Sequence, residues 1–214
     1  MPSGPRARFG RRAGPARRHS GPTAGRQPTC IPVSVGDEPV EVVDEHGAVE
    51  RLVTRAEMRT HNLRHRTVAV VVLTGAGEVV AHRRADWKDV WPGRWDVCFG
   101  GVTAVGEDWV DAARRELAEE AGVDLGPSAL RAIGGGNYAD ADVATHARVF
   151  VTTHDGPFHP ADGEVAELVV VPLTTLDGWL AGRELCEDSA AVVVPLLRRL
   201  ARGDALGAPE SAGG

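Results

Sequence analysis

The chain has 214 residues, of which 43% are hydrophobic and 25% charged, and this composition is typical of a soluble globular protein with one sizeable core. Its net charge of -6 argues against a protein that coats a nucleic acid polymer or a membrane surface, because either contact would need excess cation. No apolar run approaches the roughly 20 residues that cross a bilayer. Cys30, Cys98 and Cys186 show no disulfide or metal spacing, so a cytoplasmic protein with small-molecule partners is predicted.

The N-terminal residues 1–36 contain seven arginines and no acidic residue, in a Gly- and Pro-rich stretch. Such a stretch cannot bury enough apolar surface to fold, so a disordered tail is predicted. A transit peptide or a nucleic-acid-binding arm are alternative interpretations of the arginines. Residues 204–214 also have weak folding content, which leaves residues 37–203 as the predicted domain.

Strand signals dominate the first half of this domain. They predict two short strands around a His-Gly turn, then a hairpin whose second strand ends at Arg83 and Arg84, and one further strand within residues 95–100. A short helix and connector at residues 55–65 separate the first strands from the hairpin.

The strongest helix signal covers residues 108–122, which contain good helix formers, an acidic start and a glycine at the end. Three more strands are predicted at residues 129–139, 145–154 and 164–173, followed by a helical tail in which Pro195 lies near a helix start or kink. Strands with one strong internal helix favour an α+β fold or an α/β/α sandwich with a mixed sheet.

The predicted helix carries an unusual group of acids. At about 100° per residue its apolar positions form one stripe, and three glutamates gather on the flank of that stripe. The stripe is Val110, Ala113, Leu117 and Ala121, and the glutamates are Glu116, Glu119 and Glu120. Like charges one turn apart repel, and a divalent cation with oxygen ligands would neutralise them. A solvated acidic face is the simpler alternative.

The surrounding residues favour the metal. Gly101 is followed after five residues by Glu107, and after seven more by Arg115, where the chain reads RELAEEAGV. This resembles the Nudix box, Gx5Ex7REUxEExGU with U aliphatic, at every fixed position. The order of predicted strands and helix extends the likeness over residues 38–202.

The resemblance implies a Nudix-type α/β/α sandwich with a mixed β-sheet and a site that holds Mg²⁺ or Mn²⁺ against a small-molecule diphosphate. It makes Glu116 and Glu120 the first metal ligands, and Glu119 a third ligand or the catalytic base. Gly101 would lend its carbonyl to the metal, and Arg115 would orient a glutamate.

The same resemblance implies hydrolysis of a phosphoanhydride bond in a nucleoside diphosphate linked to another group, or in a similar organic diphosphate. Arg83, Arg84 and Lys88 are candidate ligands of the outer phosphate oxygens, with surface solubility as the alternative. Glu107 either orients a glutamate through an ion pair to Arg115 or stabilises the helix dipole.

The segment around the box also resembles the Nudix branch that contains isopentenyl-diphosphate isomerase and its hydrolase-like relatives. The isomerase needs a cysteine where this chain has Gly100 and a histidine where it has Val102, so isomerase chemistry is the weaker interpretation. His61 and His65, which lie where the isomerase binds metal, are predicted to have hydrogen-bonding or surface roles. Cys98 is predicted to be a small buried residue.

Some candidates stay open at this stage. Trp87, Trp91 and Trp95 would stack on a ligand or pack under a loop, and Glu164 and Glu167 would add a late metal ligand or remain solvated. A nucleotide-binding Nudix regulator without catalysis is a further alternative. A homodimer is possible because the N-terminal hairpin would extend a sheet edge.

Overall fold

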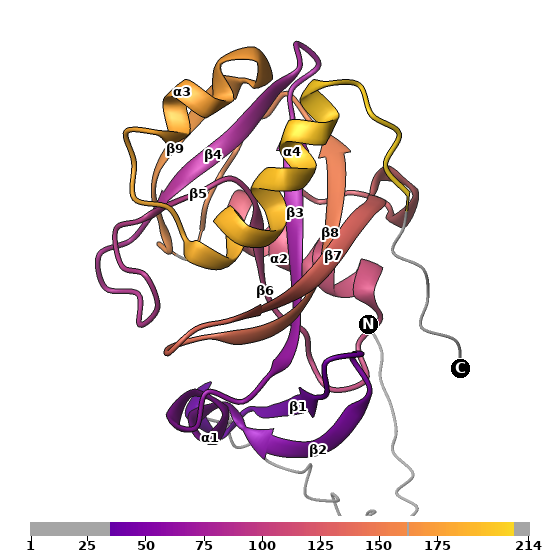
Figure 1. Ribbon diagram of the computed structural model, residues 1–214, viewed down its shortest axis with the longest axis vertical. Coiled ribbons are helices and arrows are strands. Elements are labelled where there is room, and N and C mark those ends of the chain that lie inside the picture. Colours follow the sequence, from indigo (N-terminus) through magenta and orange to yellow (C-terminus); the bar gives the residue numbers. More distant parts are fainter. Residues whose placement is uncertain (1–34, 162, 208–214) are drawn as a thin grey trace, which may run out of the picture. The chain divides into compact units, whose positions relative to one another are not determined.

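The computed structural model describes residues 35–161 and 163–207 (Figure 1). The two predicted tails, residues 1–36 and 204–214, therefore lie outside the described residues except at their inner ends, and the domain limits stay a prediction. None of the helices within the described ranges has the length and apolar character to span a bilayer.

The described residues form one nine-stranded sheet with helices on both faces. The strands are β1 Pro39–Val43, β2 Val49–Thr54, β3 His65–Leu73, β4 Glu78–Arg84, β5 Trp95–Asp96, β6 Phe99–Val102, β7 Arg131–Ala139, β8 Ala144–Thr153 and β9 Val165–Pro172. The helices are α1 Arg55–Thr60, α2 Trp109–Ala121, α3 Leu176–Leu180 and α4 Val194–Ala201, and the π-helical turn η4 Ser189–Val193 leads into α4.

The central strand β3 separates two apolar layers by the alternation of its side chains. Val68, Val70 and Val72 pack with α2 on one face, and Ala69 and Val71 pack with η4 and α4 on the other. In Figure 1 the yellow α4 lies in front of the sheet and α2 lies behind it. The predicted α/β/α sandwich is confirmed.

Both edges of β3 are paired, and they are paired differently. Along one edge β8 runs parallel to β3 through nine residue pairs, from His65 with Thr145 to Leu73 with Thr153. The other edge is shared by β1, β6 and β4 in turn, each of them antiparallel to β3. The predicted hairpin of β3 and β4 exists but is paired only at its turn, because β4 leaves β3 to pair with β9. The sheet is therefore mixed and split.

The predicted single strand at residues 95–100 is wrong. The structure has β5 and β6 there, which pair with β4 and β3 respectively. The break falls at Val97 and Cys98, whose backbone N–H groups donate to Asp96 Oδ1 at 2.7 and 3.2 Å. The side chain of Asp96 thus replaces the strand partner and turns the chain from one leaf of the sheet to the other.

The predicted box helix is confirmed as α2. Asp108 caps its start by accepting from Val110 N at 2.8 Å, and Gly122 ends it at φ 68°, a left-handed conformation that glycine adopts without strain. Ala113, Leu117 and Ala121 of the predicted stripe are buried, whereas Val110 is partly buried. The helix is fixed at both ends and along one face.

An N-terminal unit, consisting of β1, β2 and α1, precedes the central strand. β1 and β2 pair antiparallel, and Thr54 caps α1 by accepting from Glu57 N at 3.1 Å. Met58 of α1 is buried against β1, β2 and Val102 of β6. The unit is thereby attached to the strand that leads into the box. A homodimer formed through the edge at β2 stays a prediction.

Candidate functional site

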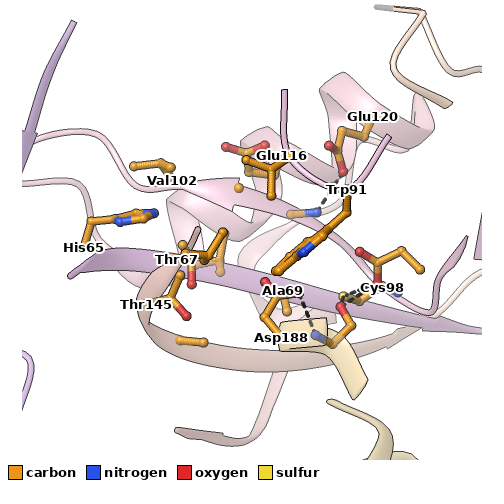
Figure 2. A pocket seen from close by; sticks show the side chains of 18 of the residues that line it. His65, Thr67, Ala69, Trp91, Cys98, Val102, Glu116, Glu120, Thr145 and Asp188 are labelled. Carbon is orange, nitrogen blue, oxygen red and sulfur yellow. Dashed lines mark hydrogen bonds between the residues drawn. The ribbon is translucent and has the colours of Figure 1, made fainter. Parts of the chain in front are cut away.

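A cavity of about 560 Å³ opens on the face of the sheet that carries η4 (Figure 2). Its walls come from α1, the loop before β5, β6, α2, η4 and the strands β3 and β8. Volumes of this order are typical of small-molecule sites. The cavity brings Gly101, Arg115 and all three box glutamates together with Arg84 and Lys88.

Short side chains make the floor of the cavity. Thr67 and Ala69 of β3 lie beside Thr145 and Ala147 of β8, and all four line the cavity. Thr145 Oγ1 is buried and has no hydrogen-bond partner within the described residues. His65 closes one end of the floor in Figure 2, and Cys98 and Asp188 lie toward the other end. The floor therefore leaves space for a ligand and offers it polar groups.

Two glycines let the box glutamates reach this cavity from the opposite layer. Gly100 N donates to Glu120 Oε2 at 2.8 Å. A Cβ at Gly101 would lie 2.7 to 2.8 Å from the carboxylate of Glu116, closer than atoms in contact allow. Because a side chain at Gly101 would take the place of the Glu116 carboxylate, and because the backbone of Gly100 binds Glu120, both glutamates pass beside β6 and line the cavity (Figure 2).

The two carboxylates are held where charge is costly. Glu116 and Glu120 are 8% and 6% exposed. Burial raises the pKa of Glu116, against the opposing effect of Arg115. Burial, and next the charge of Glu116, raises the pKa of Glu120 well above its usual range. Of the two carboxylates, Glu116 has a cation beside it, whereas Glu120 accepts only from a backbone N–H among the described residues.

Arg115 organises the front of the site. Its Nε and Nη2 donate to the two oxygens of Glu107 at 3.0 and 2.9 Å, and its Nη1 donates to Glu116 Oε1 at 2.7 Å. The bidentate bonds lower the pKa of Glu107 and raise the pKa of Arg115. Glu107 precedes the cap residue Asp108, so of its two predicted roles the ion pair to Arg115 is the one that the structure contains.

Glu119 differs from the other two box glutamates. Its side chain is 55% exposed and accepts from Arg115 Nη1 at 3.2 Å. Within the described residues, no three His, Cys, Asp or Glu side chains form a group that would hold a metal ion by themselves. The structure thus separates Glu119 from the buried pair.

A hard divalent cation fits the donors that are present. No hydrogen bond from the described part of the chain reaches Glu116 Oε2 or Glu120 Oε1, although both side chains are buried and their charges repel each other. Mg²⁺ is commonly bound by one or two carboxylates, with water and substrate phosphate oxygens completing its ligands. The cavity lining contains eight acidic and five basic residues, so an anionic diphosphate also needs added cations to enter.

The three predicted substrate ligands are placed differently. Arg83 is not part of the cavity lining, and its Nη1 donates to Asp86 Oδ1 at 2.7 Å. Lys88 lines the cavity in an ion pair with Glu164. Arg84 lines it too, and its Nε donates to the carbonyl of Val90 at 3.2 Å.

The tryptophans and the late glutamates also separate. Trp91 lines the cavity with φ 47°, whereas Trp87 is 65% exposed and Trp95 packs edge-on against Trp179. Glu164 lines the cavity, and Glu167 is exposed on β9. One tryptophan of the three and one glutamate of the two thus line the cavity.

Sequence reasoning missed a second acidic pair in the cavity, Asp96 and Asp188. Asp96 Oδ1 accepts from Ser189 Oγ at 2.7 Å as well as from the backbone at the break between β5 and β6. Burial, followed by the charge of Asp96, raises the pKa of Asp188 to about 7. Ninety-two positions separate the two aspartates, and no local pattern signals their approach.

The glycine at position 100, where an isomerase would have a cysteine, is explained by the packing of β6 on β3. A Cβ at Gly100 would lie 2.0 Å from the carbonyl oxygen of Val68, so β3 leaves no room for a side chain there. Val102, at the place of the isomerase histidine, is buried. The thiol of Cys98 is buried and donates to Asp96 Oδ1 at 3.2 Å.

The predicted hydrogen-bonding and surface roles of the two histidines are confirmed. His65 Nδ1 donates to the carbonyl of Leu63 at 2.9 Å, and burial lowers the pKa of His65 to about 4. The neutral ring presents Nε2 as an acceptor at the end of the cavity floor. His61 is exposed at the end of α1.

Comparisons with known proteins agree with this geometry. A sequence model described as the NUDIX domain matches residues 63–190. The chain is 32% identical over 167 residues to YfcD, a protein of Escherichia coli named as an uncharacterized Nudix hydrolase, covering 78% of this chain and 91% of YfcD. It therefore belongs to the Nudix family, and it is a hydrolase that acts on pyrophosphate bonds.

Solved structures share the fold. The crystal structure of DR0079 from Deinococcus radiodurans superimposes with a TM-score of 0.60 at 23% identity, covering 76% of this chain and 98% of that one. The NUDIX domain of NrtR from Shewanella oneidensis, crystallised with ADP ribose, superimposes with a TM-score of 0.51 at 18% identity, covering 69% and 99%. At these identities the likeness concerns the fold alone.

Proposed function

We propose that the protein hydrolyses a small-molecule organic diphosphate, such as a nucleoside diphosphate linked to another group, with Mg²⁺ or Mn²⁺ as cofactor. One observation carries the proposal: Glu116 and Glu120 are buried side by side and reach a cavity of small-molecule size past the bare backbone of Gly100 and Gly101. Such a pair is suited to bind a cation that also binds phosphate oxygens.

In this proposal Glu116 and Glu120 hold the metal, and the carbonyl of Gly101 is a further donor. A divalent cation bound there would neutralise the diphosphate and make a bound water more acidic. Arg115 is a positioning residue, because its guanidinium holds Glu116 Oε1 and is itself held by Glu107.

Glu119 is the proposed base. It lines the cavity and its side chain is 55% exposed, so a water molecule can reach its carboxylate. Water attacks one phosphorus, its proton passes to the carboxylate, and the bond from phosphorus to the bridging oxygen breaks. Arg84 and Lys88 bind outer phosphate oxygens, and Lys88 would exchange Glu164 for the substrate. Arg83 would take part only by leaving Asp86.

The likeness to the isomerase-containing branch rests on the residues before the box, while the crowding at Gly100 opposes isomerase chemistry itself. Residues 37–203 are the proposed extent of the domain.

A panel of organic diphosphates with Mg²⁺ or Mn²⁺ tests the proposal by the release of phosphate-containing products. Metal-dependent turnover should be lost in Glu120→Gln and kept in Glu50→Gln, a matched change on exposed β2. Tight nucleotide binding without turnover on the whole panel would instead indicate a binding module. Conversion of isopentenyl diphosphate into its allylic isomer would contradict the hydrolase assignment of the site.

A further inference from the structure

Two arginines of the N-terminal unit enter the cavity. Arg55 and Arg59 lie one turn apart on α1, and both line the cavity that contains the box glutamates. Helix α1 precedes residues 63–190, the segment that the NUDIX domain matches. The unit in front of the matched domain therefore supplies part of the wall of its site.

Most cations of the cavity already have a close carboxylate partner. Arg55 Nε donates to Glu38 Oε2 at 2.8 Å, Lys88 pairs with Glu164, and Arg115 is surrounded by glutamates. These charges are largely neutralised inside the protein.

Arg59 and Arg84 are different. Arg59 Nε is buried without a hydrogen bond in the described part of the chain, and its ion pair with Asp89 spans 3.7 Å to a side chain that is 69% exposed. The guanidinium of Arg84 donates to a backbone carbonyl, and none of the ion pairs among the described residues includes it, although the charge of Asp188 acts on it from further away. Two guanidinium groups in one cavity thus keep donors for an anion.

The electrostatics of Arg59 support this view. Burial lowers its pKa, and the charges of Arg55 and Arg84 lower it further, while Asp89 and Asp188 act in the opposite direction. Repulsion between arginines from two different elements is a cost that a bound anion would remove.

We propose that Arg59 is a substrate-binding residue that, together with Arg84, binds oxygens of a phosphate group of the diphosphate whose metal is held by Glu116 and Glu120. The planar fork of a guanidinium matches two phosphate oxygens at once, which a point charge does not. The inference rests on the proposed function, since the diphosphate at the glutamates brings the phosphate to α1. The N-terminal unit is then part of the active site.

Binding of methylenediphosphonate in the presence of MgCl₂, measured by titration calorimetry on the full chain, tests this role without turnover. Arg59→Gln should weaken binding by about tenfold or more, the loss of one charge-assisted hydrogen bond. Arg59→Lys should recover part of the affinity. Arg51→Gln makes the same change on exposed β2, outside this cavity, and should bind within about twofold of the natural chain.

Thermal melting of each variant shows whether it is folded, and Arg59→Lys replaces Arg59→Gln if the latter does not fold. Unchanged affinity in a folded Arg59 variant, equal weakening in Arg51→Gln, or no binding by the natural chain would overturn the inference. Hydrolysis that depends on Glu120 but not on Arg59 would support the proposed function and reject the role of Arg59. Binding that depends on Arg59 without any hydrolysis would support the phosphate site and reject the hydrolase.

Discussion

Glu116 and Glu120 share their cavity with a second acidic pair, the buried Asp96 and the partly buried Asp188, and Asp96 is held differently from the glutamates. Asp96 Oδ1 accepts from the backbone of Val97 and Cys98, from the Cys98 thiol and from the Ser189 hydroxyl. Among the described residues, Glu120 receives one hydrogen bond, from Gly100 N, and Glu116 receives one, from Arg115.

Acids of similar burial therefore have different roles: Asp96 stabilises the structure, whereas Glu116 and Glu120 are suited to chemistry. A carboxylate whose hydrogen bonds come from several elements fixes those elements to one another, and its removal leaves their donors unpaired. A carboxylate with an oxygen free of protein donors can bind a cation or move a proton. Burial of an acid therefore says less about its role than the number of donors that reach it.

The largest effect is expected at Glu120. Glu120→Gln should lower the turnover rate by roughly 10² to 10⁴-fold, because it removes charge from the proposed metal site. The unfolding free energy should stay the same or rise, since one of two repelling buried charges is gone. Steady-state kinetics and urea unfolding check both parts. Full activity in Glu120→Gln would remove the chemical role from the pair, and Glu50→Gln serves as the control.

A side chain at Gly100 should be nearly as damaging, through stability. Gly100→Ala brings a Cβ to 2.0 Å from the Val68 carbonyl, which forces β6 away from β3. We expect a loss of about 3 kcal/mol or more in the unfolding free energy. Gly126→Ala is the control, because a Cβ there meets no atom within 4 Å. Equal stability of the two variants would show that β6 is not constrained at Gly100.

Removal of Asp96, the carboxylate with several donors, should lower the unfolding free energy. Asp96→Ala leaves the donors at Val97, Cys98 and Ser189 unpaired, and we expect a loss of about 3 kcal/mol in urea unfolding. Asp142→Ala removes an exposed carboxylate and should change stability by less than about 0.5 kcal/mol. An Asp96→Ala variant that keeps its stability but loses activity would show that Asp96 has a chemical role and not a structural one.

The smallest expected effect is on pH dependence. Burial raises the pKa of Asp188 to about 7, against 3.8 for the ordinary group. The charges of Asp96 and Asp140 act in the same direction, and the backbone N–H of Ser189 and the charge of Arg84 act against it. A raised carboxyl pKa stabilises the fold at low pH, and this stability is lost progressively as the pH rises from about 4 to about 7.

Asp188→Asn should therefore flatten the loss of unfolding free energy across that pH window, because the amide stays neutral. Urea unfolding at a series of pH values measures the slope, with Asp142→Asn as the matched control. Parallel slopes for the natural chain and Asp188→Asn would contradict a raised pKa at Asp188.

The sequence predicted those parts of the molecule that depend on local order. The period of Ala113, Leu117 and Ala121 located α2, and the same period placed Glu116 and Glu120 on its flank. The division of the strand at residues 95–100 was not predictable, because it depends on a side chain that replaces a strand partner.

Other residues of the cavity depend on contacts between distant segments. Asp188 meets Asp96 only after η4 packs on the sheet, and Arg59 meets Arg84 only after α1 is attached through Met58. Neither Asp188 nor Arg59 belongs to a sequence motif from which its neighbour could be predicted. Position in the chain therefore identified the side of the cavity where a metal is proposed to bind, and it left most of the opposite walls undetermined.

The parallel pairing of β3 with β8 has a consequence for how the chain folds. His65 and Thr145 are neighbours on the floor of the cavity although 80 positions separate them. Contacts of such long sequence separation form late and slow the folding of a domain. During synthesis the box helix can emerge well before its floor exists, so the nascent chain carries the complete motif for a time without a site in which it could bind a diphosphate.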